Sequence, residues 1–178
     1  MAKLIKMPRE EHGPSRPVDS PYFAAQVAEL AHEIWSEHYA KILSAEQIDY
    51  MLTNMQSAES IWKDIRENNY HYYLLLHEGM AIGYFAIKYE IEKRTIFLSK
   101  IYVLQKYRGQ GYGKWIIKFI SRLAKIKGCE SIWLTVNKNN TLSIHVYNQL
   151  GFRTIDSIVT DIGGGFLMDD YVMRKELI

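Results

Sequence analysis

The sequence predicts one α/β domain, of the α+β kind, in which helices flank a central, mixed but mostly antiparallel sheet. Three observations support this fold class. Apolar residues recur at helical spacing over the first part of the 178-residue chain. Runs of aromatic and β-branched residues separated by short turns follow, which is typical of an antiparallel meander. Strands and helices then alternate before a glycine-rich closing hairpin, and 48% hydrophobic residues suffice for one core.

Residues 1–19 are predicted to form an irregular N-terminal arm, and residues 20–178 the single domain. Three of the four prolines, Pro8, Pro14 and Pro17, lie in this arm. The arm lacks the apolar segment of a secretory signal, and no run approaches the roughly 18 apolar residues of a membrane span. A single cysteine suits a reducing compartment. We therefore expect a cytoplasmic protein with no membrane partner.

Three helices are expected at the start of the domain because apolar residues recur at helical spacing. A serine followed by a proline precedes the first helix. A serine with a glutamine three positions later forms a capping-box pattern before the second helix. The three helices are predicted at residues 22–39, 43–55 and 57–68.

Strands are expected from residue 70 onward, where the apolar period changes. Three runs joined by short turns predict an antiparallel meander. A long helix ending near Gly128 separates the third strand from a fourth, so these two strands should lie parallel. Asn140 is expected to cap a further helix that ends at Gly151, and two strands close the domain. The predicted strands are residues 70–76, 80–92, 94–104, 131–137, 154–160 and 166–177.

The stretch "QKYRGQGYGK", residues 105–114, places three glycines between a predicted strand and a predicted helix. Alternating glycines let successive backbone N–H groups turn toward one point, and the following helix adds the positive end of its dipole. Seven basic and no acidic residues lie between Ile101 and Gly128. The pattern predicts an anion-binding loop, with a glycine-rich connector flanked by solvated lysines as the alternative.

Two familiar nucleotide-binding patterns do not fit this loop. The P-loop pattern needs a glycine-lysine pair at a fixed distance from an earlier glycine, followed by serine or threonine. Neither Gly109 nor Gly111 has such a pair at that distance, and no serine or threonine follows Lys114. The dinucleotide pattern lacks its third glycine, at position 114 or 116. The net charge of +2 also does not indicate a protein that binds nucleic acid.

Two motifs in the correct order make the chain similar to the GNAT N-acetyltransferase superfamily. The segment "RGQGYG", residues 108–113, matches the family signature R/Q-x-x-G-x-G/A. The helix that begins at Asn140 and ends in "YNQLGF", residues 147–152, resembles the second signature. The part with the motifs covers residues 98–152, and the order of elements extends the resemblance loosely over residues 22–176.

The resemblance implies acetyl-coenzyme A as the acetyl donor, and no metal or redox cofactor. Its pyrophosphate would lie on backbone N–H groups of the glycine loop, because a multiply charged anion suits such a cradle. The pantetheine arm would pair with the free backbone edge of the preceding strand, whose N–H groups would also polarise the thioester carbonyl. The implied coenzyme-binding residues are Ile101, Tyr102, Val103, Arg108, Gly109, Gln110, Gly111, Tyr112, Gly113, Lys114, Asn140 and Ser143.

Tyr147 occupies the position of the general acid in similar proteins. A phenol with a pKa near about 10 is protonated at neutral pH and can donate to the departing thiolate. Packing in the core is its alternative role. Many relatives carry a glutamate as base on the strand before the loop, where this chain has Ser99 to hold a water. The carboxylates that would act through a water are Glu33, Glu37, Glu90 and Asp170, and a solvated surface charge is the alternative for each.

The resemblance, which extends loosely to bacterial polyamine acetyltransferases, places the acceptor pocket between the first two helices and the closing hairpin. The expected acceptor-binding residues are Trp35, Glu37, Tyr39 and Asp170, since aromatic faces and carboxylates suit a cationic amine. We therefore expect an acyltransferase that acetylates a small primary amine, polyamine-like or another amino compound, by direct attack. The alternatives are acetylation of a protein or peptide, and a regulatory domain that binds acyl-CoA without catalysis. The exposed edge of the closing hairpin favours a homodimer.

Overall fold

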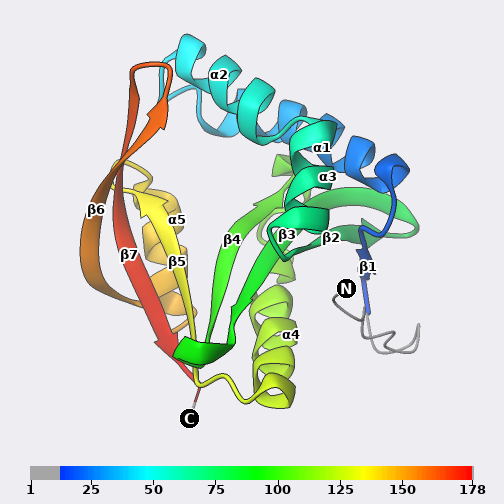
Figure 1. The fold of residues 1–178 in the computed structure, drawn as a ribbon, viewed down its shortest axis with the longest axis vertical. Coiled ribbons are helices and arrows are strands. Elements are labelled where there is room, and N and C mark those ends of the chain that lie inside the picture. The colour runs from blue at the N-terminus through cyan, green and yellow to red at the C-terminus, as the bar shows by residue number, and fades with distance from the viewer. Residues whose placement is uncertain (1–12, 178) are drawn as a thin grey trace.

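The computed structural model describes residues 13–177, which form a seven-stranded sheet and five α-helices (Figure 1). The predicted fold class, a mostly antiparallel mixed sheet flanked by helices, is confirmed. In chain order the elements are β1 (Ser15–Pro17), α1 (Pro21–His38), α2 (Ala45–Met55), α3 (Ala58–Glu67), β2 (Tyr70–His77), β3 (Met80–Glu90), β4 (Thr95–Val103), α4 (Tyr112–Lys127), β5 (Ser131–Asn137), α5 (Thr141–Gln149), β6 (Arg153–Gly163) and β7 (Phe166–Glu176).

The first three helices begin at serines, as predicted. The Ser44 hydroxyl accepts a hydrogen bond from the N–H of Gln47 (3.1 Å), and Ser57 caps α3 in the same way. The capping box before α2 is only half formed, because the Gln47 side chain donates to the Leu167 carbonyl of β7 instead. Ser20 occupies the N-cap of α1 without a capping side-chain bond. Gln47 thus ties α2 to the closing hairpin.

The N-terminal arm is not irregular throughout. Within the predicted arm, Ser15–Pro17 forms β1 and pairs antiparallel with β2. Val18 continues this contact by donating its N–H to the Tyr72 carbonyl (2.9 Å). The prolines concealed this strand in the sequence, although an edge strand tolerates proline. Residues 1–12 of the predicted arm lie outside the described part of the chain.

The strand order is β1-β2-β3-β4-β5-β7-β6, and β4 with β5 forms the parallel pair that the long helix between them predicted. Their pairing covers only Thr95–Phe97 of β4 and Ser131–Trp133 of β5. Beyond these residues the two strands separate, and Figure 1 shows the gap widening toward the end of the sheet where α1 and α2 lie. We call this opening between β4 and β5 the wedge.

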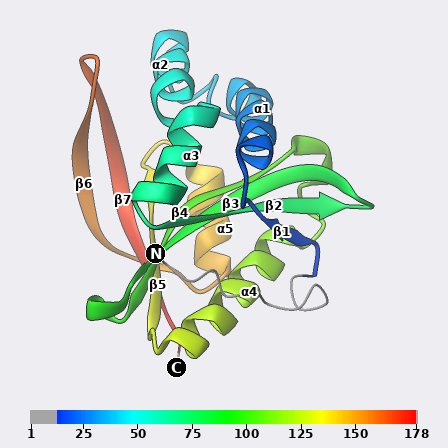
Figure 2. The ribbon, with the colours of Figure 1, turned by 45° about the vertical axis from the view of Figure 1, so that its right-hand side comes forward.

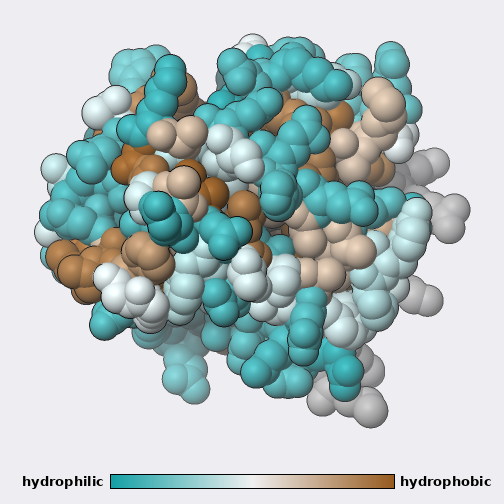
Figure 3. Space-filling view, turned by 90° about the horizontal axis from the view of Figure 1, so that it is seen from above, coloured by the Kyte–Doolittle hydropathy of each residue, from teal (hydrophilic) through white to brown (hydrophobic). Residues whose placement is uncertain are grey.

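Helices cover both faces of the sheet. Figure 2 shows α4 and α5 on one face and α1 and α3 on the other. A large apolar cluster fills each interface: Phe85 and Phe119 belong to the one under α4, and Ile34 and Tyr84 to the one under α1. Viewed from the end with α1 and α2, hydrophobic residues are visible at the surface between hydrophilic residues (Figure 3). No helix within residues 13–177 is long and apolar enough to cross a membrane.

Candidate active site

A β-bulge at Ser99 accompanies the opening of the wedge. The pairing of β4 with β3 shifts between Leu98 and Lys100, which leaves Ser99 as the extra residue. The bulge also reverses the side-chain alternation: Leu98 lies in the cluster under α4, and Ile101 and Val103 lie against the same cluster after the bulge. Because a bulged strand bends, β4 can turn away from β5 at this point.

Backbone groups of β4 beyond the bulge point to two sides. The N–H of Leu104, just after β4, donates to the Ile82 carbonyl of β3 (2.9 Å), which fixes the alternation of the ladder. Tyr102 therefore also directs its N–H to β3, whereas Ile101 and Val103 direct theirs into the wedge. Of the three residues predicted to offer free backbone N–H groups, two therefore do so, Ile101 and Val103. Tyr102 contributes its side chain to the site instead.

The glycine loop has the backbone that its sequence predicts. Gly109 and Gly111 have φ of 76° and 87°, a left-handed conformation that favours glycine. Gly111 is the N-cap of α4, and the N–H groups of residues 112–114 have no carbonyl of their own helix to bond. A Cβ added to any of the three loop glycines would meet no described atom within 4 Å. The Arg108 N–H is already bonded to the Gln105 carbonyl (3.1 Å), so the cradle begins at Gly109.

The other predicted loop residues surround this cradle. The Gln110 side chain donates to the Lys106 carbonyl (3.2 Å). The Tyr112 hydroxyl lies 2.6 Å from His77 Nδ1 at the end of β2. Lys114 is exposed on the first turn of α4. The backbone N–H groups of the loop thus stay unobstructed with the cationic Lys114 beside them, which suits an anion.

Polar side chains tie the glycine loop, α1 and α5 to the wedge. Arg108 Nε donates to the Val103 carbonyl at the end of β4 (2.8 Å). The Asn140 side chain caps α5 by accepting from the Ser143 N–H (3.2 Å), and its Nδ2 lies 3.0 Å from His38 Nε2. Burial, and then the charge of Arg108, lowers the pKa of His38. His38 is therefore largely neutral at pH 7, so its Nε2 can accept from Asn140.

Tyr147 lies on α5, where sequence reasoning expected an acid or a packing residue. Its half-buried ring packs edge to face on Phe152, with 5.8 Å between the ring centroids. Burial, and then Tyr39, raises the pKa of the Tyr147 phenol, so the group is protonated at neutral pH. Within residues 13–177 its hydroxyl makes no hydrogen bond, so its proton is not committed to another group.

Aromatic residues from α1 and β4 gather near Tyr147. The hydroxyl of Tyr39, which follows α1, lies 3.1 Å from that of Tyr102 on β4, and both tyrosines interact electrostatically with Tyr147. Trp35 packs behind them, with ring centroids 4.8 Å from Tyr39 and 5.4 Å from Tyr102. It is 3% exposed and donates to the Tyr84 hydroxyl, so it supports the tyrosines from the core.

Asp170 of β7 adds a buried carboxylate to this cluster. The residue is 8% exposed, and its Oδ1 is buried without a hydrogen-bond partner in the described structure. Burial, and then Asp169, raises the pKa of Asp170 to about 6, against the opposing effects of a hydrogen bond with Thr135 and the charge of Lys138. Asp170 also contributes to the raised pKa of Tyr39, so the carboxylate lies within electrostatic range of the tyrosines.

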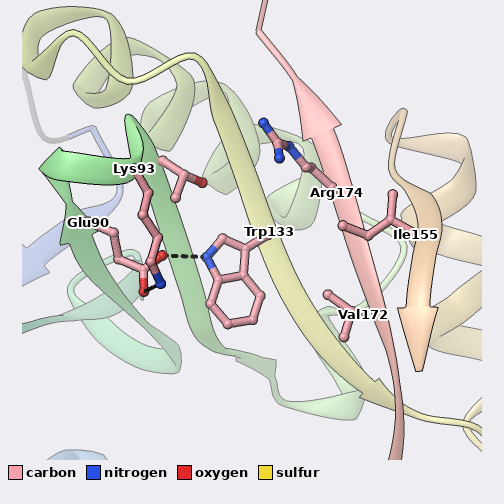
Figure 4. Close-up of a pocket in the computed structure, with 7 residues that line it drawn as sticks. Glu90, Lys93, Trp133, Ile155, Val172 and Arg174 are labelled. Carbon is pink, nitrogen blue, oxygen red and sulfur yellow. Dashed lines mark hydrogen bonds and ion pairs between the residues drawn. The ribbon is translucent and has the colours of Figure 1, made fainter. Parts of the chain in front are cut away.

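The other predicted carboxylates lie apart from this cluster. Glu33 and Glu37 are exposed on α1. Glu90 accepts a hydrogen bond from Trp133 Nε1 (2.8 Å) and lines a hollow of about 210 Å³ at the closed end of the wedge (Figure 4). Of the four predicted carboxylates, Asp170 is the one that lies beside the tyrosines. Within residues 13–177 no three His, Cys, Asp or Glu side chains are grouped to hold a metal.

Sequence reasoning missed two residues of the site. His38 approaches Asn140 across 102 positions of the chain, and no local pattern marks that contact. The sequence gives no sign that Thr135 of β5 affects Asp170, because the two residues approach each other only when β7 pairs with β5. The only hint for His38 was its position next to Tyr39, which the sequence did assign to the acceptor side.

Comparison with known proteins identifies the family of this chain. The model of the acetyltransferase (GNAT) family matches residues 26–152, and the chain belongs to this family. A spermine/spermidine N(1)-acetyltransferase of Bacillus subtilis (strain 168) is 26% identical over 152 residues, or 81% of this chain and 95% of that protein. A thialysine N-epsilon-acetyltransferase of Sus scrofa is 42% identical over 62 residues, or 35% of this chain and 36% of that protein.

Solved structures share the fold. The PaiA N-acetyltransferase of Thermoplasma acidophilum in complex with coenzyme A has a TM-score of 0.75 at 23% identity, over 91% of this chain and 97% of that one. A spermidine N-acetyltransferase SpeG chimera from Vibrio cholerae and hSSAT has a TM-score of 0.65 at 18% identity, over 92% and 94%. Because the chain belongs to the GNAT family, this protein is an N-acetyltransferase, and acetyl-CoA is the acetyl donor of the family.

Proposed function

We propose that this enzyme acetylates a primary amine of a small, polyamine-like molecule by direct attack on acetyl-CoA. The observation that carries this proposal is the Tyr147 phenol, protonated and without a hydrogen bond, beside tyrosines of α1 and β4 at the wedge. The amine nitrogen attacks the thioester carbonyl, the carbon-sulfur bond breaks, and Tyr147 gives its proton to the thiolate.

Acetyl-CoA would occupy the wedge and the glycine loop. The N–H groups of residues 109–114 would bind the pyrophosphate, because those of residues 112–114 have no carbonyl of their own helix to bond and lie at its positive end, with the loop residues before them. The N–H groups of Ile101 and Val103 would pair with the pantetheine arm and polarise the thioester carbonyl. Asn140 and Ser143 would stand at the other side of the arm, where Asn140 already caps α5.

A cationic acceptor suits the side of the wedge opposite the coenzyme. Tyr39 and Tyr102 offer aromatic surface, and the Asp170 carboxylate offers the opposite charge. The Bacillus subtilis relative that aligns over 95% of its length is named as a spermine/spermidine acetyltransferase, which supports a polyamine-like acceptor. In this proposal Trp35 fixes the two tyrosines, and Glu37 contributes at most from the exposed rim.

Release of the coenzyme A thiol, measured with a panel of acceptors, tests this function. We expect turnover with spermidine and spermine, and no product from a tertiary diamine of matched length and charge. Turnover with lysine peptides alone would replace the proposal by peptide acetylation. Binding of acetyl-CoA without turnover of any amine would replace it by the non-catalytic alternative.

We also propose that the protein forms a homodimer through β6. The edge strand is exposed from Arg153 to Asp161 and carries the exposed apolar residues Ile155, Ile158 and Val159. Antiparallel pairing of two copies about a twofold axis would bring Arg153 of each copy toward Asp161 of the other. Sedimentation velocity should show a dimer that Ile158→Lys dissociates, and a monomeric wild-type protein would exclude it.

A further inference from the structure

One carboxylate oxygen of this protein is buried without compensation. Asp170 Oδ1 has no hydrogen-bond partner within residues 13–177, although the residue is 8% exposed. An unpaired ionised carboxylate is costly to bury, because it loses its hydration and gains no partner. A ligand that supplies an N–H at this position would remove the penalty.

None of the charged and titratable groups described around Asp170 supplies a hydrogen-bond donor or an unpaired cation to its Oδ1. The nearest cation, Lys138, forms an ion pair with Asp169. Tyr39 approaches from α1 and is neutral, because burial raises its pKa. Thr135 of β5 lowers the pKa of the carboxyl group, but Oδ1 has no partner within residues 13–177. The bare oxygen therefore lies in the tyrosine cluster with no cation of its own.

We propose that Asp170 is the base that takes a proton from the acceptor ammonium before attack. This role rests on the proposed function and adds a catalytic residue to it. The ammonium gives one proton to the Asp170 carboxylate, and the neutral amine attacks the thioester. When the carbon-sulfur bond breaks, Tyr147 protonates the thiolate and the second amine proton restores the phenol. Asp170 then releases its proton to water, so atoms and charges balance.

Asp170 fits this role better than its neighbours. The position at which many relatives carry a glutamate holds Ser99, which is no base, and its hydroxyl accepts from Lys100 Nζ (3.0 Å). Lys100 lies over the rings of Tyr70 and Tyr72, away from the wedge, and burial lowers its pKa to about 8. Asp170, with a pKa of about 6, is mostly ionised at neutral pH and still basic enough to accept a proton.

The pH dependence of kcat/KM for spermidine tests the proposal. For the wild type we expect an acidic limb near pH 6 and a plateau above it, because the reactive pair is ionised Asp170 with the ammonium. Asp170→Asn still binds the ammonium but reacts only through the small fraction that has lost its proton, so both its kcat and its kcat/KM should rise about tenfold per pH unit without a plateau. At pH 7 its kcat should be about 100-fold lower than wild type.

An acceptor that is already deprotonated isolates the proton step. Trifluoroethylamine is largely neutral at pH 7, so Asp170→Asn should acetylate it at a rate within a few-fold of wild type. A variant that keeps its kcat for spermidine and raises only KM would make Asp170 a binding residue and overturn the proposal. A limb near pH 8 that persists in Asp170→Asn would assign the base to Lys100. Absence of wild-type turnover with every amine would instead reject the proposed function itself.

Two neighbouring variants provide matched controls. Asp169 raises the pKa of Asp170 and Lys138 lowers it. Asp169→Asn should therefore move the acidic limb to lower pH, and Lys138→Gln should move it to higher pH. A limb that stays in place in both variants would contradict the assignment, because the acidic limb would then not follow the ionisation of Asp170.

Discussion

Two buried polar groups of this protein, the Tyr84 hydroxyl and the Asp170 carboxylate, differ in whether their hydrogen bonds are satisfied. Beneath α1, the Tyr84 hydroxyl accepts from Trp35 Nε1 (3.1 Å) and donates to Gln56 Oε1 (3.0 Å). All three residues are at most 3% exposed. At the wedge, Asp170 is nearly as buried, yet its Oδ1 has no partner in the described structure. One region satisfies its polar atoms internally, and the other leaves one unsatisfied.

This difference separates what stabilises the fold from what serves the reaction. A satisfied buried network contributes to stability, and breaking it exposes a desolvation penalty. An unsatisfied carboxylate opposes folding and is tolerated where a ligand completes it. Variants beneath α1 should therefore lower stability and spare kcat, whereas variants at the wedge should lower activity and leave stability unchanged or higher.

The largest effect on coenzyme binding is expected for Gly111→Val in the glycine loop. Valine disfavours the φ of 87° at this N-cap, so the loop must move and its N–H groups lose the pyrophosphate. Loss of two bonds to a charged group, about 2 kcal/mol each, weakens coenzyme A binding about 1000-fold. Titration calorimetry measures this loss. Gly79→Val, at a φ of 81° in the turn between β2 and β3, imposes the same strain and should leave binding intact.

Tyr147→Phe should lower kcat by about 100-fold or more, because the thiolate loses its proton donor. Coenzyme affinity and the midpoint of urea unfolding should stay close to wild type, since the hydroxyl has no hydrogen bond in the described structure and phenylalanine keeps the contact with Phe152. Steady-state kinetics and urea unfolding measure the two quantities. Unchanged kcat would remove Tyr147 from the acid role and leave it a packing residue.

Gln56→Leu should destabilise the folded state by about 1–3 kcal/mol, because the Tyr84 hydroxyl then has a buried proton without an acceptor. Urea unfolding measures this loss, and kcat of the folded fraction should remain near wild type. Gln26→Leu makes the same chemical change at an exposed hydrogen bond and should stay within about 0.5 kcal/mol. A loss of activity larger than the loss of folded protein would break the separation between the two regions.

The sequence predicts the fold well and the site in part. Helix periodicity, capping serines and the glycine loop are local signals, so the helices and the left-handed loop follow from them. β1 depends on pairing with β2, which lies more than 50 positions later in the chain, and its prolines conceal it. His38 and Asp170 acquire their roles through elements that meet only in the folded chain. The sequence identifies candidate carboxylates such as Asp170. The folded structure is needed to show which of them is buried without a hydrogen-bond partner.

Asp170→Asn is expected to change the free energy of unfolding least. It should raise stability, whereas Gln56→Leu should lower it. The carboxyl pKa is about 6 in the folded protein and near the usual value of 3.8 when unfolded. The folded state therefore binds more protons between these values, so wild-type stability falls as pH rises through this window. The asparagine variant has no such group. A difference of about two pKa units corresponds to about 3 kcal/mol, and partial solvent screening of the carboxylate lowers the expected gain at pH 8 to about 1–2 kcal/mol.

Urea unfolding without ligand at pH 4, 6 and 8 measures this advantage, which should grow with pH and vanish near pH 4. Asp169→Asn is the matched control: it removes an exposed carboxylate paired with Lys138, so it should give no comparable gain at pH 8. A variant at Asp170 that is less stable than wild type at every pH would mean that the carboxylate is satisfied after all. A gain in stability together with a loss of kcat would show that the buried charge is retained for the reaction, because it opposes folding.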